Sequence, residues 1–412
     1  MKFSTILALY ASAKILPAMA WPGMKNIMAE LEHKLAARQD EVGDGDGTDV
    51  EDSDELIGDL VTVGAVTDVA QQIQGVITGS IDGFSSEAYT TTVPAKKSAA
   101  CAADTCCIWS YIAADMKKKF SGSSGRCNGF ARAAVRMGFH DAGAWSKTST
   151  NGGADGSLIL AGEISRAENN GLQDIVSWTT SLYSKYKTYG VGMADMIQMA
   201  ATVATVVCPL GPRIRSYVGR IDNSAPAPDG LLPDVNADAE TLIQLFADKT
   251  IKTHGLTALI GAHSTSQQRF VNTSRAFDPQ DSTPGIWDVN FYNQTLQPAS
   301  AIPKRVFKFN SDVVLSQHPV VATEWNKFVT DQSDWNEDFS REYVRLSLLG
   351  VNNINNLIEC TKVLPAAKTT YTPPDKAIIL KWLAGQFPKL GKFLDSADKL
   401  NSTLLKSLGY TP

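Results

Sequence analysis

Two segments of this 412-residue chain each place a histidine at the end of an apolar helical pattern, close to an oxygen-rich loop. In the first, RAAVRMGFHDAG, Arg136 and His140 are four residues apart, so on a helix both side chains would lie on one face. In the second, LTALIGAHSTSQQ, the apolar pattern ends at His263. This paired arrangement predicts one histidine above and one below a flat bound group.

The chemistry of both segments is consistent with that prediction. A guanidinium and an imidazole side by side can stabilise a developing anion and transfer a proton. Asp141 is followed by NGGADGS, and Ser264 is followed downstream by FDPQDSTPGIWD. Both loops carry closely spaced oxygens of the kind that hard cations require, although Asx-rich turns without a metal are common.

An ordered set of motifs extends from about Cys101 to Cys360: CxxxxCC, RxxFHDA, GGADGS, ENNGL, GRID with PAPDGLLP, AHS and DSTPGIWD. The set resembles the plant-type haem peroxidases, and most closely the secreted fungal class II group of lignin and manganese peroxidases. The resemblance implies a mostly α-helical fold of two lobes with haem b between them and few short strands. Independently, long helical patterns alternate with Gly- and Pro-rich loops from Cys101 onward.

The resemblance assigns His263 as the axial ligand of the haem iron and Asp312 as the carboxylate that accepts its Nδ1 hydrogen. Taken alone, a histidine at the end of an apolar helix is more often a satisfied core residue. The AHS context and the nearby oxygen-rich loop favour the ligand instead.

On the opposite face, the resemblance implies that His140 takes a proton from hydrogen peroxide and returns it to the departing oxygen. Arg136 would stabilise the charge that develops as the O–O bond breaks. Asn169 would accept a hydrogen bond from His140, the carboxylate of Glu163 would support Asn169, and Phe139 would pack over the haem.

The resemblance also implies two structural Ca²⁺ ions, in which glycine and isoleucine contribute only carbonyl oxygens. The expected ligands are Asp141, Gly153, Asp155 and Ser157 at the first ion, and Ser264, Asp281, Thr283, Ile286 and Asp288 at the second.

Several features indicate an extracellular protein. Residues 1–20 have the early lysine, apolar middle and Ala-Met-Ala ending of a secretory signal peptide. The six cysteines form an even set that allows fifteen pairings by counting alone. The resemblance selects Cys101–Cys107, Cys106–Cys360 and Cys127–Cys208. Sequons at Asn272, Asn293 and Asn401 fit a secreted glycoprotein.

We expect four parts along the chain: the signal peptide, an acidic N-terminal extension or propeptide over residues 21–97 that is largely disordered, a peroxidase domain over 98–365 and a C-terminal extension over 366–412. The net charge of −5 argues against a nucleic-acid partner. The run Val191–Val207 carries Asp195 and Gln198, which favours a buried core helix over a membrane span. We expect a monomer.

Three departures from the family pattern concern the electron donor. Manganese peroxidases hold Mn²⁺ with two glutamates and an aspartate, and this chain has Gly129, Ala133 and Arg269 at those positions. Lignin peroxidases carry a surface tryptophan where this chain has Ala258. Gln280 takes the place of a phenylalanine below the haem.

The sequence therefore predicts a secreted haem peroxidase that reduces hydrogen peroxide and oxidises small phenolic or aromatic donors by single electrons at the haem edge. One alternative is a lignin-degrading enzyme that uses another tryptophan, such as Trp145, Trp178 or Trp287. A second is a secreted haem- or calcium-binding protein without turnover, against which the intact distal residues argue. A third, a non-haem metal hydrolase, lacks further ligands at the usual spacing.

Overall fold

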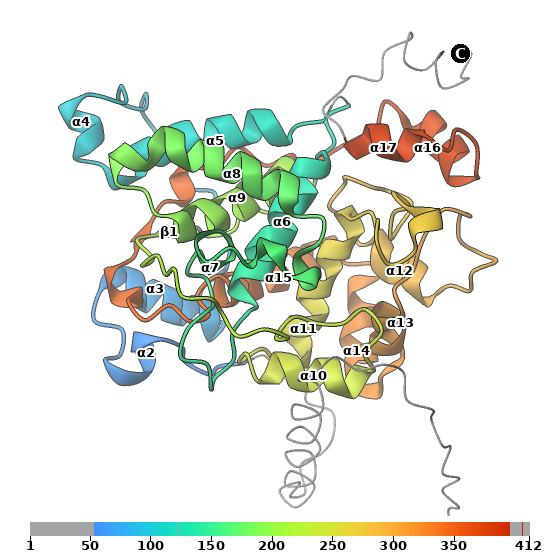
Figure 1. Ribbon diagram of the computed structural model, residues 1–412, viewed down its shortest axis with the longest axis horizontal. Coiled ribbons are helices and arrows are strands. Elements are labelled where there is room, and N and C mark those ends of the chain that lie inside the picture. The colour runs from blue at the N-terminus through green and yellow to red at the C-terminus, as the bar shows by residue number, and fades with distance from the viewer. Residues whose placement is uncertain (1–52, 123, 396–405, 407–412) are drawn as a thin grey trace, which may run out of the picture. The chain divides into compact units, whose positions relative to one another are not determined.

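The computed structural model describes residues 53–122, 124–395 and 406. The helices, shown in Figure 1, are α2 (Asp59–Thr62), α3 (Asp68–Ile77), α4 (Ala99–Ala102), α5 (Thr105–Phe120), α6 (Gly129–Ala142), α7 (Ser157–Leu160), α8 (Gln173–Tyr186), α9 (Met193–Val207), α10 (Ala239–Ala247), α11 (Thr253–Ile260), α12 (Asn290–Leu296), α13 (Asn310–Gln317), α14 (Pro319–Phe328), α15 (Gln332–Leu346), α16 (Lys376–Leu383) and α17 (Leu390–Asp395).

Short 3₁₀ turns lie between them: η1 (Glu163–Ser165), η2 (Ala167–Asn169), η3 (Lys187–Tyr189), η4 (Gly261–Thr265), η5 (Thr273–Arg275), η6 (Ile354–Asn356) and η7 (Thr361–Val363). The named strands of the described chain are β1 (Tyr217–Val218) and β2 (Ile358–Glu359), which pair antiparallel with Tyr217 opposite Glu359. The predicted mostly α-helical fold is confirmed.

The first group of helices is built around α9, which packs against α6, α5 and α8. Every residue of α9 is buried, as expected for a core helix. Gly138 permits the close approach of α6, because a Cβ there would lie 2.7 Å from the Cβ of Ala201 and 2.5 Å from the hydroxyl of Tyr343. The polar side chain of Gln198 is accommodated because its amide donates to the carbonyl of Gly138 at 3.1 Å.

The second group contains α11, α12, α13 and α14, and α15 packs against α11 in this group and against α3. Aromatic side chains fill its interior. Trp287 stacks on Trp335 with ring centroids 5.0 Å apart, and Tyr292 and Trp325 are buried beside them. The grouping matches the expected two helical lobes.

The N-terminal boundary requires a correction. Residues 1–52, which include the expected signal peptide, lie outside the described part, but residues 53–97 are ordered in the structure. Ile73 of α3 is fully buried in the main core. Arg345 of α15, also fully buried, donates to the carbonyls of Glu55 and Ile77 at 2.7 and 2.8 Å. The expectation of disorder was wrong for residues 53–97, because the apolar face of α3 completes the core next to α15.

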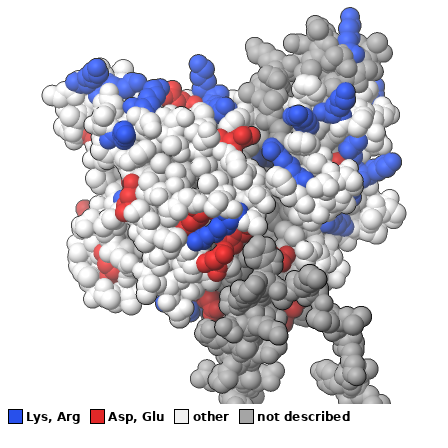
Figure 2. All heavy atoms as spheres, viewed as in Figure 1, with Lys and Arg blue, Asp and Glu red and all other residues white. Residues whose placement is uncertain are grey.

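The C-terminal extension forms a small second core together with part of the domain. Ile378, Ile379 and Trp382 of α16 pack with Val306. Asp375, just before α16, forms a mostly buried ion pair with Arg126 at 3.0 Å. Figure 2 shows Lys and Arg side chains exposed where Figure 1 draws α16 and α17, which carry Lys376, Lys381 and Lys392. The extension is therefore an amphipathic pair of helices attached to the domain as far as residue 395.

The six cysteines form Cys101–Cys107, Cys106–Cys360 and Cys127–Cys208, the pairing that the resemblance implies. Within the described ranges no single helix has the length and apolar content to cross a bilayer, although the bent pair Gln173–Tyr189 and Met193–Val207 reaches those limits together.

If residues 53–97 belong to the folded domain, Ile73→Ala should lower the free energy of unfolding by about 2–5 kcal/mol, as large-to-small core substitutions do. Val66→Ala, at a position 64% exposed in the same segment, is the control and should change it by less than about 0.5 kcal/mol. Denaturant unfolding would measure both. Equal, negligible effects would mean that α3 is not part of the cooperative core.

Candidate active site

The distal side of the candidate site is a chain of hydrogen bonds that begins on α6. The Oδ1 of Asn128 caps this helix by accepting from the amides of Phe130 and Ala131. Arg136 lies one turn before His140, and its Nε donates to Nε2 of His140 at 3.0 Å. Nδ1 of His140 lies 2.7 Å from Oδ1 of Asn169. Because an amide oxygen only accepts, Nδ1 carries the ring hydrogen and Nε2 carries the lone pair.

The distal side chains are held firmly by their surroundings. The guanidinium of Arg136 donates to the carbonyls of Asn170 and Glu168 at 2.7 and 3.0 Å. Burial and the positive charge of Arg136 lower the pKa of His140 to about 3, against the opposing effect of Asn169. The imidazole is therefore neutral near pH 7. Phe139 contacts it edge-on, with ring centroids 5.8 Å apart.

Glu163 lies beside Asn169, but its part differs from the one expected. The Asn169 amide donates to the main-chain carbonyl of Glu163 at 2.9 Å, and not to its carboxylate. The carboxylate accepts instead from the amide of Ala227 at 2.7 Å and pairs with Arg166 at 3.4 Å. The turn η1 presents the carbonyl towards Asn169, which leaves the side chain free to hold the loop near residue 227.

The proximal side is built from η4 and α13. Nδ1 of His263 lies 3.1 Å from Oδ1 of Asp312, whose side chain is buried. The rings of Phe291 and Phe309 contact the imidazole edge-on, with centroids 5.7 and 5.5 Å away. Nε2 of His263 has no hydrogen-bond partner in the described part of the chain, and the side chain is 34% exposed. An oriented imidazole with an available Nε2 is suited to binding a metal in a planar cofactor.

The first oxygen-rich loop folds around Asp141. Its carboxylate accepts from the amides of Gly156 and Leu158 at 3.1 and 3.2 Å. Burial and the charge of Asp155 raise the pKa of Asp141 well above its usual value. The hydroxyl oxygen of Ser157 is buried without a hydrogen-bond partner. A divalent cation would offset the cost of burying these groups, so the loop has the donor set for one.

The second loop gathers its expected ligands as well. Thr283 Oγ1 lies 3.1 Å from Oδ1 of Asp281 and 3.0 Å from Oδ1 of Asp288. Its single hydroxyl hydrogen can be donated to either carboxylate. Ser264 Oγ donates to the carbonyl of Ile286 at 3.1 Å. Burial and Asp288 raise the pKa of Asp281, and burial raises that of Asp288 to about 6. Oδ2 of Asp281 is buried without a hydrogen-bond partner, which again suits a cation.

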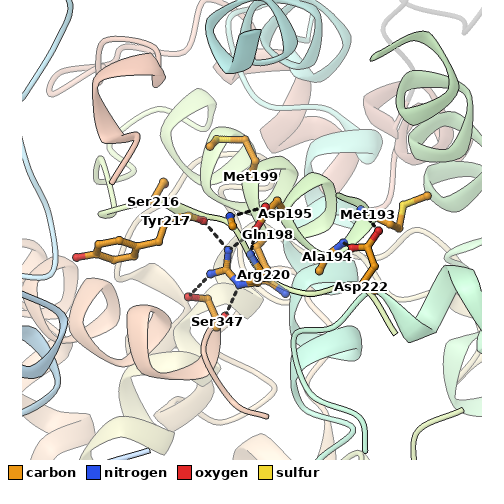
Figure 3. A network of polar contacts seen from close by, with 12 residues as sticks. Met193, Ala194, Asp195, Gln198, Met199, Ser216, Tyr217, Arg220, Asp222 and Ser347 are labelled. Carbon is orange, nitrogen blue, oxygen red and sulfur yellow. Dashed lines mark hydrogen bonds and ion pairs between the residues drawn. The ribbon is translucent and has the colours of Figure 1, made fainter. Parts of the chain in front are cut away.

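A buried polar network supports the first loop. The sequence showed the GRID motif that contains Arg220, but it did not reveal the network. Asp195 of α9 pairs with Arg220 at 3.0 Å, as Figure 3 shows. Its carboxylate also accepts from the amide of Gly219. The amide of Asn223 donates to the carbonyl of Asp155 at 2.9 Å. The network therefore attaches the loop to the core helix α9.

The positions at which related enzymes oxidise Mn²⁺ or bulky donors are mostly buried or occupied by other side chains in this chain. Ala258 is fully buried, and its carbonyl accepts from the indole of Trp335 at 2.9 Å. Trp287 is also fully buried, whereas Trp145 and Trp178 are partly buried against the core. Arg269 lies over the ring of Phe277, 5.1 Å from its centroid. Both polar side-chain atoms of Gln280 are buried without a hydrogen-bond partner.

Comparison with known proteins adds an independent finding. A model of the peroxidase family matches residues 112–331, more than half of the chain. The chain is 28% identical over 290 residues to a peroxidase of Arthromyces ramosus, an alignment that covers 65% of this chain and 78% of the relative. It is 30% identical over 289 residues to ligninase LG5 of Phanerodontia chrysosporium, covering 65% and 76%. It is 29% identical over 288 residues to versatile peroxidase VPS1 of Pleurotus eryngii, covering 65% and 76%.

Proposed function

The chain belongs to the peroxidase family and is a haem peroxidase similar to the fungal class II enzymes, and from this premise we propose how its residues divide the work. His263 would hold the iron of haem b through its available Nε2, and Asp312 would orient the imidazole and increase its basicity through Nδ1. When bound, haem would supply the redox-active iron at which hydrogen peroxide is reduced and from which single electrons are exchanged with donors.

The distal residues then move the protons. His140 accepts a proton from hydrogen peroxide at Nε2 and returns it to the departing oxygen. Asn169 keeps the other ring hydrogen on Nδ1, which holds Nε2 in the accepting tautomer. Arg136, fixed by two main-chain carbonyls, stabilises the negative charge that develops as the O–O bond breaks. The observation that carries the proposal is this aligned series from Arg136 through His140 to Asn169.

We assign two structural Ca²⁺ ions to the loops at Asp141 and Asp281. The peptide bond joins Asp141 to His140 and Ser264 to His263, so each cation would fix the backbone next to a working histidine. The buried hydroxyl of Ser157 and the free carboxylate oxygen of Asp281 support the assignment.

The donor would be a small phenolic or aromatic molecule that gives single electrons at the haem edge. Arg269 cannot ligate Mn²⁺, and buried Ala258 supplies no redox-active surface side chain. The buried position of Trp287 argues against its use as a surface substitute. Approach would be beside the loop 226–233, which Glu163 holds through Ala227.

Export from the cell fits the same proposal. Three disulfide bonds use all six cysteines, and such bonds persist in oxidising compartments. Residues 1–20 would direct the export and then be removed. Asn293 is exposed and would be available for glycosylation, whereas Asn401 lies outside the described residues.

The distal base can be tested by His140→Leu. Because a positioned base contributes roughly 10²–10⁴-fold, the haem-loaded variant should react with hydrogen peroxide at least about 100-fold more slowly in stopped-flow absorbance. His318→Leu removes a histidine from a surface pair with Glu240 and should keep the full rate. An unchanged rate in His140→Leu would place the base elsewhere.

The calcium assignment can be tested with the Ca²⁺-selective chelator EGTA. Removal should lower activity and melting temperature together, because the cations fix both catalytic histidines. At Ca²⁺ one hundred times above its dissociation constant, each site should account for about 2.7 kcal/mol of stability. Readdition of Ca²⁺ should restore both, and Asp281→Asn should mimic part of the loss. If exhaustive chelation changes neither the melting temperature nor the rate, the loops are ordinary turns.

Donor scope can be tested by steady-state kinetics. Phenolic donors should be oxidised readily, Mn²⁺ should give no saturable stimulation, and veratryl alcohol should react poorly. Saturable Mn²⁺ oxidation would reveal a Mn²⁺ site made of other residues. Efficient oxidation of veratryl alcohol would contradict the haem-edge proposal, and substituting Trp145 and Trp178 singly would then locate the surface residue.

A further inference from the structure

Three side chains with metal-ligating atoms meet away from the haem and calcium loops. They are His254 in the first turn of α11, Glu324 on α14 and Asp338 on α15. One ligand atom from each lies within 4.8 Å of both others. Three separate helices therefore deliver an imidazole and two carboxylates to one point.

The distances already approach those of a metal centre. Nε2 of His254 lies 3.1 Å from Oε1 of Glu324 and 3.0 Å from Oδ2 of Asp338. Ligands about 2.0–2.1 Å from a tetrahedral Zn²⁺ are separated by about 3.3 Å, so a shift of a few tenths of an ångström would suffice. The imidazole is also held in place, because it stacks on Phe328 with ring centroids 6.2 Å apart.

The buried carboxylate of Glu324 gives a second, independent indication of a cation. Its side chain is 2% exposed, and Oε1 faces Nε2 of His254 at 3.1 Å with no further hydrogen-bond donor among the described residues. The other oxygen, Oε2, already pairs with Lys327 at 2.8 Å. Oε1 is therefore buried and points into the cluster, where the imidazole of His254 is its nearest polar neighbour.

The charges around the cluster also favour a cation. Asp334 and Glu337 of α15 interact electrostatically with Asp338 of the cluster, Asp331 at the N-cap of α15 interacts with Asp334, and Lys327 is a basic neighbour. Burial raises the pKa of Asp334, and the negative charges of Asp338, Glu324 and Asp331 raise it further. A bound divalent ion would reduce this mutual repulsion.

We propose that His254, Glu324 and Asp338 form a site for a divalent transition metal of the Zn²⁺ class, with solvent in the remaining position. An imidazole together with carboxylates favours such a metal over Ca²⁺, which takes only oxygen ligands. The ion would clamp the first turn of α11 to α14 and α15. Since α11 ends just before η4, the clamp would stiffen the helix that leads to His263.

Zn²⁺ binding to the haem-loaded protein in excess Ca²⁺ tests the proposal, measured by isothermal titration calorimetry after dialysis against a weak chelator. One Zn²⁺ per chain should bind saturably and raise the melting temperature. Removing even an outer partner of a metal site costs 10–100-fold in affinity, so Glu324→Gln and Asp338→Asn should each weaken binding by at least about tenfold. Asp338→Asn is the safer variant for folding, because this side chain is 15% exposed.

His318→Gln is the matched control. His318 also pairs with a carboxylate, that of Glu240 at 2.8 Å. Among the described residues this pair belongs to no cluster of three metal-ligating side chains, so the substitution should leave Zn²⁺ binding unchanged. Absence of saturable binding to the unaltered protein would overturn the proposal and leave the cluster an ion pair. Binding that survives both carboxylate variants would overturn it equally. Neither result bears on the peroxidase reaction, because the readout is Zn²⁺ affinity.

Discussion

The contact of α6 with α9 is the packing on which the candidate site depends. Gly138 lets the two helices approach so closely that any side chain at this position would collide with Ala201 and Tyr343. This approach fixes the line along which α6 runs, and Arg136 and His140 lie on either side of Gly138. The distal histidine is thus positioned by a helix that cannot shift without disrupting the most extensive packing in the described core.

Each histidine is then oriented by an acceptor from a different part of the chain. Asn169 in η2 receives the Nδ1 hydrogen of His140, and Asp312 on α13 receives that of His263. Both bonds leave Nε2 as the atom with the proposed role, as the base in His140 and as the iron ligand in His263. The neutral amide and the charged carboxylate explain why similar imidazoles can serve different roles, since only the carboxylate strongly increases ligand basicity.

The loops that follow the histidines carry buried carboxylates, whose removal from water costs free energy unless a partner offsets it. The pKa of Asp141 and that of Asp281 are raised by burial and by a neighbouring carboxylate, which is the condition that a bound cation removes. The cluster at His254, on the second helical group, brings two carboxylates together with an imidazole. We therefore propose that cations on both sides of α11 and His263, at the Asp281 loop and at the His254 cluster, help to fix this part of the chain. The aromatic core around Trp335 also stabilises it.

The sequence by itself indicated the proposed chemistry of the site, because Arg136 and His140 at helical spacing, and each histidine near an oxygen-rich loop, are local patterns that need no knowledge of the tertiary fold. The resemblance supplied the disulfide pairing, which counting alone left open among fifteen possibilities. Only the tertiary structure decided that α3 is part of the core, since the acidic run before it hid its apolar face. It alone revealed that Glu163 uses its carbonyl and that His254, Glu324 and Asp338 converge. Those residues are 70 and 14 positions apart along the chain, and only helix packing can bring such distant groups within 4.8 Å.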